Sequence, residues 1–303
     1  MGPPFDHVMV LGDSELSYNH VRAWSMIGID AKITSLVNKK AFTSKNDGNT
    51  SSLAVDVCET DYAKRARMFK EALRANVSVL TMEPVLKTFD STKKILEQFQ
   101  TRKKKGDGNK PSFTIIDPIA HHPLIVLSKK EISEGRIGTP RILRLEVLLR
   151  DKALSDYSLS QSLIHALRAS ELLFEPRKLT RVFAKKVKTR TSNYFVILAN
   201  LEEGCTAHIV AGNSAAQGKF EFAINGTRGM LSFNESKTLE LPSGAAEYSN
   251  ALKASESVEV LVSAFSYVAP KSGTSTDPSS LAQRLAQAVL ESVKSSKPIP
   301  ISR

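Results

Sequence analysis

The chain has 303 residues, of which 41% are hydrophobic and 24% are charged, and its formal net charge is +11. This length predicts two domains of ordinary size, and the hydrophobic content is sufficient for true cores.

No apolar run is long enough to span a bilayer, and residues 1–7 lack the basic and apolar regions of a signal peptide, so we expect a cytoplasmic protein. Cys58 and Cys205 lie far apart in strand-like segments, which predicts buried free thiols in a reducing cytosol.

The positive charge is spread over many segments of the chain. Its densest clusters are residues 102–105, followed by a Gly- and Asn-containing loop, and residues 185–190, beside an expected strand end. Neither cluster has interleaved aromatic residues on which bases could stack. A nucleic-acid or phospho-ligand binder therefore stays as an alternative, but we expect most of this charge to be solvated surface rather than a nucleic-acid site.

The first 120 residues alternate short apolar segments with amphipathic ones. Strands are expected at 8–11, 31–37, 53–58, 77–82 and 113–116, and helices at 18–27, 62–75, 88–100 and 124–134. This alternation implies parallel strand pairing in a doubly wound sheet. The polar segment 38–52 looks too short for a full helix-and-strand repeat, so we predict a shortened Rossmann-like domain over residues 1–120.

From Arg141 onward the chain is rich in β-type segments. They are expected at 141–149, 178–187, 194–201, 205–211, 219–224, 230–233 and 258–264, with helices at 159–174 and 279–293. We predict an α+β domain over residues 121–303 with a large, mostly antiparallel open sheet, and its final helix could pack back on the first domain. A sheet face exposing Val196, Leu198 and Ile209 predicts a homo-oligomer, unless helices of the same chain cover that face.

Four segments carry a resemblance to a known family. Residues 72–84, which end in Thr81-Met82-Glu83-Pro84, resemble the helix, strand and Glu-Lys-Pro signature of the glucose–fructose oxidoreductase/inositol dehydrogenase family. In the same order, residues 129–138 resemble its helix ending in Gly-x-Ile-Gly, residues 225–231 its Gly-Thr-x-Gly turn, and residues 281–301 its closing helix and strand. The resemblance implies an NAD- or NADP-dependent oxidoreductase acting on a sugar- or polyol-like small molecule between two domains.

The expected cofactor loop departs from the usual pattern. A dinucleotide-binding turn has Gly-x-Gly-x-x-Gly, because glycine lets the backbone approach the pyrophosphate, but here only Gly12 remains. The alternative to cofactor binding is that Asp13 or Ser14 caps the helix that follows. After the second strand no acid is present to bind a ribose diol, and Lys39 and Lys40 could suit a 2′-phosphate instead. The candidate cofactor-binding residues are Gly12, Asp13, Ser14, Asn38, Lys39, Glu83 and Pro84.

Glu83 and His165 are the candidate catalytic residues. In the family that the chain resembles, the lysine of Glu-Lys-Pro handles the substrate's hydroxyl proton, together with a histidine from a helix of the second domain. Glu83 stands at the place of that lysine, and His165 matches the histidine. Both could act as acid–base groups. The alternatives are a glutamate that accepts backbone or arginine hydrogen bonds and a histidine that is satisfied by a carbonyl.

Four more polar residues are expected at the substrate cleft. Gln161 and Arg168 stand where the resembled helix carries acids, and His121 or the adjacent His122 is expected to line the cleft. No third ligand at metal spacing accompanies the two histidines, so we predict no metal site. The missing lysine and glycines leave an alternative to a divergent enzyme, namely a non-catalytic relative serving as a ligand sensor or protein-interaction module.

Overall fold

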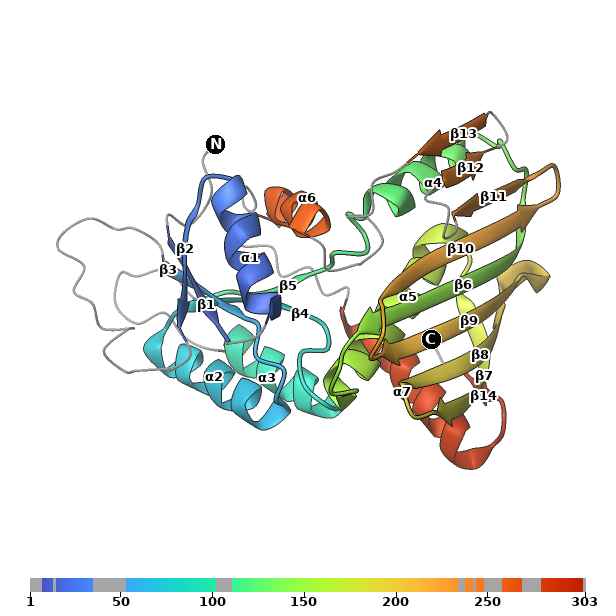
Figure 1. Ribbon diagram of the computed structural model, residues 1–303. Coiled ribbons are helices and arrows are strands. Elements are labelled where there is room, and N and C mark those ends of the chain that lie inside the picture. The colour runs from blue at the N-terminus through green and yellow to red at the C-terminus, as the bar shows by residue number, and fades with distance from the viewer. Residues whose placement is uncertain are drawn as a thin grey trace. The chain divides into compact units, whose positions relative to one another are not determined.

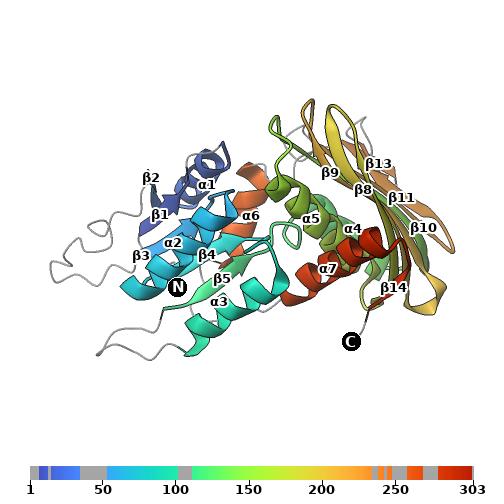
Figure 2. The same cartoon turned by 90° about the horizontal axis from the view of Figure 1, so that it is seen from below.

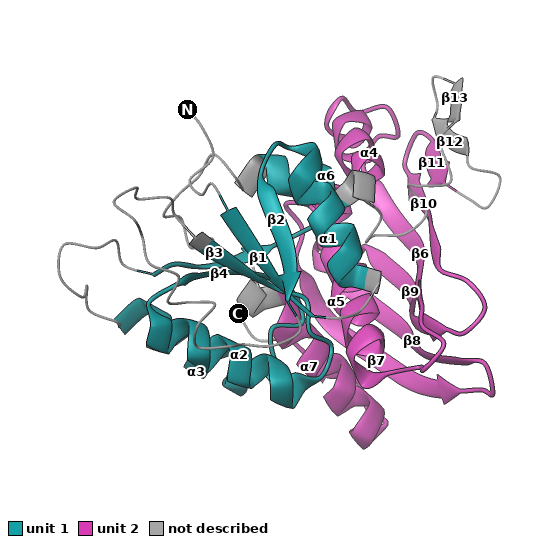
Figure 3. Cartoon of the chain, turned by 60° about the vertical axis from the view of Figure 1, so that its left-hand side comes forward, with its two compact units in different colours: residues 1–118, 261–280 teal, residues 119–260, 281–303 magenta. Residues whose placement is uncertain are grey.

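The computed structural model describes residues 7–12, 15–34, 53–101, 111–233, 238–241, 244–247, 258–268 and 279–301. The chain divides into two compact units, Met1–Pro118 with Leu261–Ser280 and Ile119–Val260 with Leu281–Arg303 (Figure 3). None of the helices in the described part of the chain is both long enough and apolar enough to cross a membrane.

The first unit is a parallel sheet with helices on both faces (Figure 1). The sheet has five strands in the order β2-β1-β3-β4-β5. Helices α1 and α6 lie on one face, and α2 and α3 lie on the other (Figure 1). In chain order the elements are β1 (His7–Leu11), α1 (Glu15–Met26), β2 (Asp30–Thr34), β3 (Leu53–Val57), α2 (Tyr62–Ala75), β4 (Ser78–Met82), α3 (Phe89–Thr101), β5 (Phe113–Ile116) and α6 (Val258–Val268).

The strand order confirms the shortened Rossmann-like sheet that the sequence predicts. Strand β1 pairs in parallel with β2 on one side, Val8 opposite Ala31, and with β3 on the other, Val10 opposite Asp56. Strand β3, which follows β2 in the chain, therefore lies on the opposite side of β1 from β2. No described strand lies beyond β2. The direction of winding therefore reverses between β1 and β3, the point at which doubly wound folds bind ligands.

Local signals in the sequence explain why the helices of this unit form where they do. Asp61 caps α2, because its carboxylate accepts hydrogen bonds from the backbone N–H groups of Ala63 and Lys64, both at 2.9 Å. The helix ends at Asn76, which adopts the left-handed conformation with φ of 60°. Phe69 of α2 then packs edge-on against Phe113 of β5, with ring centroids 5.2 Å apart.

The second unit contains a nine-stranded sheet in the order β13-β12-β11-β10-β6-β9-β8-β7-β14. Its described pairs are antiparallel except β6 with β9, and α4, α5 and α7 lie on one face of the sheet (Figure 2). The predicted large, mostly antiparallel sheet is therefore confirmed. The elements are α4 (Pro123–Ser133), β6 (Pro140–Arg150), α5 (Asp156–Phe174), β7 (Leu179–Lys188), β8 (Ser192–Leu201), the 3-10 turn η1 (Glu202–Gly204), β9 (Thr206–Ser214), β10 (Lys219–Gly226), β11 (Met230–Phe233), β12 (Thr238–Leu241), β13 (Gly244–Glu247), α7 (Ser279–Ser295) and β14 (Ile299–Pro300).

Two of the segments that carry the family resemblance pack against each other in this unit. Gly138 has a φ of +70°, and a Cβ there would lie 2.4 Å from the hydroxyl of Thr227. That hydroxyl instead accepts a hydrogen bond from the backbone N–H of Thr139 at 3.0 Å, and Arg228 donates to the carbonyl of Gly135 at 3.0 Å. Glycine is thus required where the turn after β10 meets the chain entering β6.

Two expectations about particular segments are wrong. Residues 258–264 belong to helix α6 rather than to a strand, and Leu261, Ala264 and Phe265 are buried at helical spacing. The segment is short and five of its seven residues are apolar, so its periodicity does not separate helix from strand. Ile209 was expected on the exposed face but is buried. It lies on the same face of the sheet as its buried partner Ile197, whereas Val196 and Leu198 on the opposite face are 41% and 48% exposed.

Candidate active site

The carboxyl edge of the parallel sheet collects the candidate residues of the first unit. Gly12 follows β1, Cys58 and Glu59 follow β3, and Glu83 follows β4. Parallel strands point the same way, so these residues lie along one edge of the sheet. The pair β1 and β3, where the winding reverses, places Gly12 next to Cys58, whose N–H donates to the carbonyl of Leu11 at 2.8 Å.

Gly12 is required at the start of the loop after β1. Its φ is +149°, and a Cβ would lie 2.5 Å from the hydroxyl oxygen of Ser17 and 3.2 Å from the backbone carbon of Cys58. The missing side chain therefore lets the first turn of α1 approach the end of β3. In dinucleotide-binding folds the first glycine of the loop makes the tight turn after the first strand, and the N-terminus of α1 suits an anionic group. The described residues fit a nucleotide in this respect.

Several predicted residues lie outside the described part of the chain. They are the candidate cofactor residues Asp13, Ser14, Asn38 and Lys39 and the basic cluster at residues 102–105.

The turn that carries Glu83 and Pro84 is held by a buried arginine from α2. Arg65 is fully buried, and its guanidinium donates to the carbonyl oxygens of Glu59 at 2.7 Å, Met82 at 2.8 Å and Val85 at 2.9 Å. It also donates to the hydroxyl of Thr81. Pro84 follows a cis peptide bond and is buried, whereas Glu83 is half-buried. Arg65 therefore joins the carboxyl ends of β3 and β4 and fixes the backbone on either side of Glu83.

Arg65 was not predicted to be part of the site. It belongs to a helix that we expected to be amphipathic, in which arginine is ordinarily a surface residue. A signal was present, however, because residue 65 extends the stripe of buried residues at 68, 69, 72 and 73 by one helical turn. An arginine on the apolar face of a helix indicates a guanidinium that binds backbone carbonyls.

Helix α5 in the second unit carries three predicted site residues, namely the catalytic candidate His165 and the cleft candidates Gln161 and Arg168. Gln161 and His165 are four residues apart and both are 2% exposed, and Arg168 follows three residues later. Arg168 is half-buried and lies 3.8 Å from the carboxylate of Glu171. A hydrogen bond from Lys129 to Glu175, together with the charges of Lys129 and Arg168, lowers the pKa of Glu175. At this end of α5, Glu171 and Glu175 are therefore paired with the cations Arg168 and Lys129.

The adjacent histidines of the second unit differ in their surroundings. His122 is fully buried at the N-terminus of α4, where its Nδ1 accepts a hydrogen bond from the N–H of Leu124 at 3.2 Å. Its ring stacks on Phe220 with centroids 4.6 Å apart. His121 is half-buried. Helix capping therefore accounts for His122, and His121 is the member of the pair that retains an exposed surface.

Sequence comparison finds no family model and no curated protein that matches the chain. Comparison of structures does find matches. A scyllo-inositol dehydrogenase from Lactobacillus casei, solved with bound NAD(H) and scyllo-inositol, has a TM-score of 0.70 at 14% identity, over 98% of this chain and 99% of its own. A myo-inositol 2-dehydrogenase from Lactobacillus plantarum has a TM-score of 0.71 at 14% identity, over 98% of this chain and 100% of its own.

A third solved structure is an oxidoreductase from Agrobacterium radiobacter in complex with NAD+, L-tartaric acid and magnesium. It has a TM-score of 0.70 at 15% identity, over 97% of this chain and 98% of its own. The chain therefore has the two-domain fold of the inositol dehydrogenases from end to end. This confirms, at the level of the fold, the resemblance seen in the sequence.

Proposed function

We propose that the protein is a divergent NAD- or NADP-dependent oxidoreductase of the glucose–fructose oxidoreductase/inositol dehydrogenase type, acting on a sugar- or polyol-like substrate. The observation that carries the proposal is the reversal of winding between β1 and β3, in a fold shared over 98% of the chain with an inositol dehydrogenase that binds NAD(H). In this proposal residues 1–120 are the cofactor domain, and residues 121–303 are the substrate and oligomerisation domain.

The cofactor would bind at the carboxyl edge of the parallel sheet. Gly12 allows α1 to begin against β3, and the free N–H groups at the start of α1 suit a diphosphate. We assign Asp13 and Ser14 to the same loop and Asn38 and Lys39 to the ribose end, where a lysine favours the 2′-phosphate of NADP. The acidic loop would weaken the attraction for a diphosphate, so we expect lower affinity than a glycine-rich loop provides.

Glu83 is the residue that we assign to proton transfer. A nicotinamide bound here would supply the acceptor for the hydride that leaves the hydroxyl-bearing carbon of the substrate. The carboxylate of Glu83 would take up the hydroxyl proton, so that the alcohol becomes a carbonyl. Arg65 holds the backbone on both sides of Glu83, so the position of this carboxylate is set by the fold. His165 is assigned as the second acid–base group and Gln161, Arg168 and His121 as substrate contacts.

The test is turnover of a panel of polyols and sugars with each dinucleotide. Replacing Glu83 or His165 with alanine is expected to lower kcat about 10²–10⁴-fold, which is the range for a general acid or base. Exposed residues of the same types, Glu97 on α3 and His7 on β1, supply matched alanine controls that should leave kcat unchanged. A chain that binds dinucleotide but oxidises no polyol would favour the alternative, a non-catalytic ligand sensor or interaction module.

We further propose that the chain forms a homo-oligomer through the open face of its nine-stranded sheet. Ile142 and Met230 on this face are 40% and 47% exposed, in addition to Val196 and Leu198. A hollow in the face is lined by residues of β6, β8, β9, β10 and β11. Exposed apolar sheet faces of this kind commonly mark subunit contacts. Sedimentation of the purified chain as a monomer at micromolar concentration would contradict this proposal.

The face also carries a charged group that is already paired within the chain. The ammonium of Lys219 lies 3.0 Å from Glu146 and 3.1 Å from Glu221. Burial opposes the charge on Lys219, but hydrogen bonds to the two glutamates raise the pKa of this lysine above its ordinary value. The lysine is therefore already neutralised within the chain, which lowers the cost of covering this part of the face.

We also propose a cytosolic location. Cys58 and Cys205 are buried and are not joined in a disulfide, which is typical of a reducing cytosol.

A further inference from the structure

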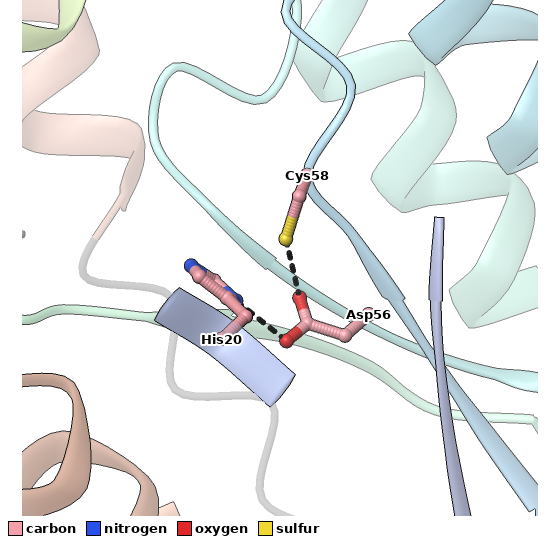
Figure 4. A group of neighbouring side chains, drawn as sticks. All are labelled: His20, Asp56 and Cys58. Carbon is pink, nitrogen blue, oxygen red and sulfur yellow. Dashed lines mark hydrogen bonds and ion pairs between the residues drawn. The ribbon is translucent and has the colours of Figure 1, made fainter. Parts of the chain in front are cut away.

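Three side chains with metal-ligand chemistry meet in the interior of the first unit. His20 on α1, Asp56 on β3 and Cys58 just after β3 are 1%, 0% and 1% exposed, and their ligand atoms all lie within 4.8 Å of one another. Figure 4 shows the carboxylate of Asp56 between the other two side chains. One of its oxygens lies 2.7 Å from Nδ1 of His20, and the other lies 3.7 Å from Sγ of Cys58.

The three side chains and the groups around them have the chemistry of a metal centre. Imidazole nitrogen, carboxylate oxygen and thiolate sulfur are the three ligand types that zinc takes in proteins, and three protein ligands leave a fourth position for water. The indole N–H of Trp24 donates to Asp56 at 2.7 Å, as outer hydrogen bonds do to metal-bound carboxylates. A cation would also compensate for burying a carboxylate completely.

A second observation points to a ligand at this place. Ser17 is fully buried, three residues before His20 and therefore on the same face of α1. Among the described residues its hydroxyl has no hydrogen-bond partner. It lies where Gly12 meets the backbone of Cys58. A buried hydroxyl without a partner is costly, and a metal-bound water is the kind of group that would satisfy it.

We propose that His20, Asp56 and Cys58 bind a divalent cation of the zinc class, with water in the fourth position. The site ties α1 to β3 and supports α6. Phe265 of α6 stacks on Trp24 with ring centroids 4.0 Å apart and meets His20 edge-on at 5.2 Å. The sequence predicted no metal, because its ligands come from segments more than thirty residues apart rather than from a short motif. The proposal does not depend on dinucleotide binding.

The test is titration of the full chain with Co²⁺ and Zn²⁺ under a non-chelating reductant. We expect one equivalent of Co²⁺ to produce thiolate-to-cobalt charge transfer and tetrahedral ligand-field bands, and Zn²⁺ to remove them. Each metal should also change the fluorescence of Trp24, the chain's single tryptophan, and raise Tm. These readouts on the wild-type chain need no variant and no enzymatic activity.

Matched cysteine variants locate the metal. Cys58→Ser should lose the charge-transfer band and the rise in Tm. Cys205→Ser should keep both, because the other buried thiol is hydrogen-bonded to the carbonyl of Pro140 in the second unit. Absence of a charge-transfer band and of any Tm shift in the wild-type chain would overturn the proposal. Equal metal binding by wild type and Cys58→Ser would overturn it as well, since that metal would lie on other residues.

Discussion

Replacing Arg65 with methionine should destabilise the first unit far more than the same change at Arg67, two residues away on α2. The guanidinium of Arg65 is fully buried and donates to three backbone carbonyls and one hydroxyl. A hydrogen bond from a charged group contributes roughly 1.5–3 kcal/mol, and bonds within one network are not additive. Because methionine leaves buried carbonyls unpaired, we expect a loss of about 3–5 kcal/mol in the free energy of unfolding.

Arg67 supplies the control. Its side chain is 80% exposed and pairs with Glu71 at 2.8 Å, one helical turn along. Removing such a pair costs about 0.3–0.5 kcal/mol. Arg65→Lys should fall between the two, because a single ammonium keeps the charge but cannot reach all four acceptors.

The assay is urea unfolding followed by the fluorescence of Trp24. This residue is fully buried in the same unit as Arg65, so the signal reports on the unit that the substitution affects. A difference of less than about 1 kcal/mol between Arg65→Met and Arg67→Met would refute the reasoning, because the network would then contribute no more than one ordinary hydrogen bond.

Three further outcomes follow from the structure. Leu198→Glu should shift the oligomer to monomer in sedimentation, whereas Val126→Glu, at a residue 52% exposed on α4, should leave the oligomer unchanged. Burial raises the pKa of Asp151, but hydrogen bonds from two serines and the backbone hold it below its ordinary value of 3.8. Its ionised form therefore stabilises the fold above that pH, and Asp151→Asn should cost about 1 kcal/mol at neutral pH, a difference that vanishes as pH falls through the lowered pKa in acid unfolding. Gly28→Ala should cost about 1–2 kcal/mol for its positive φ alone, and Gly12→Ala should cost more in thermal unfolding because its Cβ also meets Ser17 at 2.5 Å; equal costs would contradict the close packing assigned to Gly12.

Periodicity and turn chemistry predicted most of the fold. Helix α2 has the bounds that the sequence predicts, since Asp61 and Asn76 mark its ends with side-chain chemistry. Where such signals are weak, the prediction fails. Eight of the eleven residues of α6 are apolar, so a strand and a buried helix have similar patterns, and the tertiary packing of residues such as Phe265 on Trp24 distinguishes them.

The parts of the candidate site that depend on contacts between distant segments could not be predicted from the sequence. The role of Arg65 depends on carbonyls of Glu59, Met82 and Val85, which approach it only after two strands and a turn have formed. Ile209 was predicted to lie on the open face with Val196 and Leu198. Successive residues of a strand point to opposite sides of the sheet, so the side on which Ile209 lies depends on its register with β8. Glu83 and His165 were predicted because of the resemblance to the family's motifs, not because of any local physical signal, and their roles stay predictions.

Direct binding of dinucleotide tests the central claim most sharply. Titration of the chain with NADH and with NADPH, followed by energy transfer from Trp24 and by thermal unfolding, measures affinity without requiring a known substrate. We predict saturable binding of at least one of the two, with stabilisation of about 2.7 kcal/mol at roughly 100 times Kd. Absence of both energy transfer and stabilisation at millimolar dinucleotide would contradict the account, and the carboxyl edge between β1 and β3 would then not be a cofactor site.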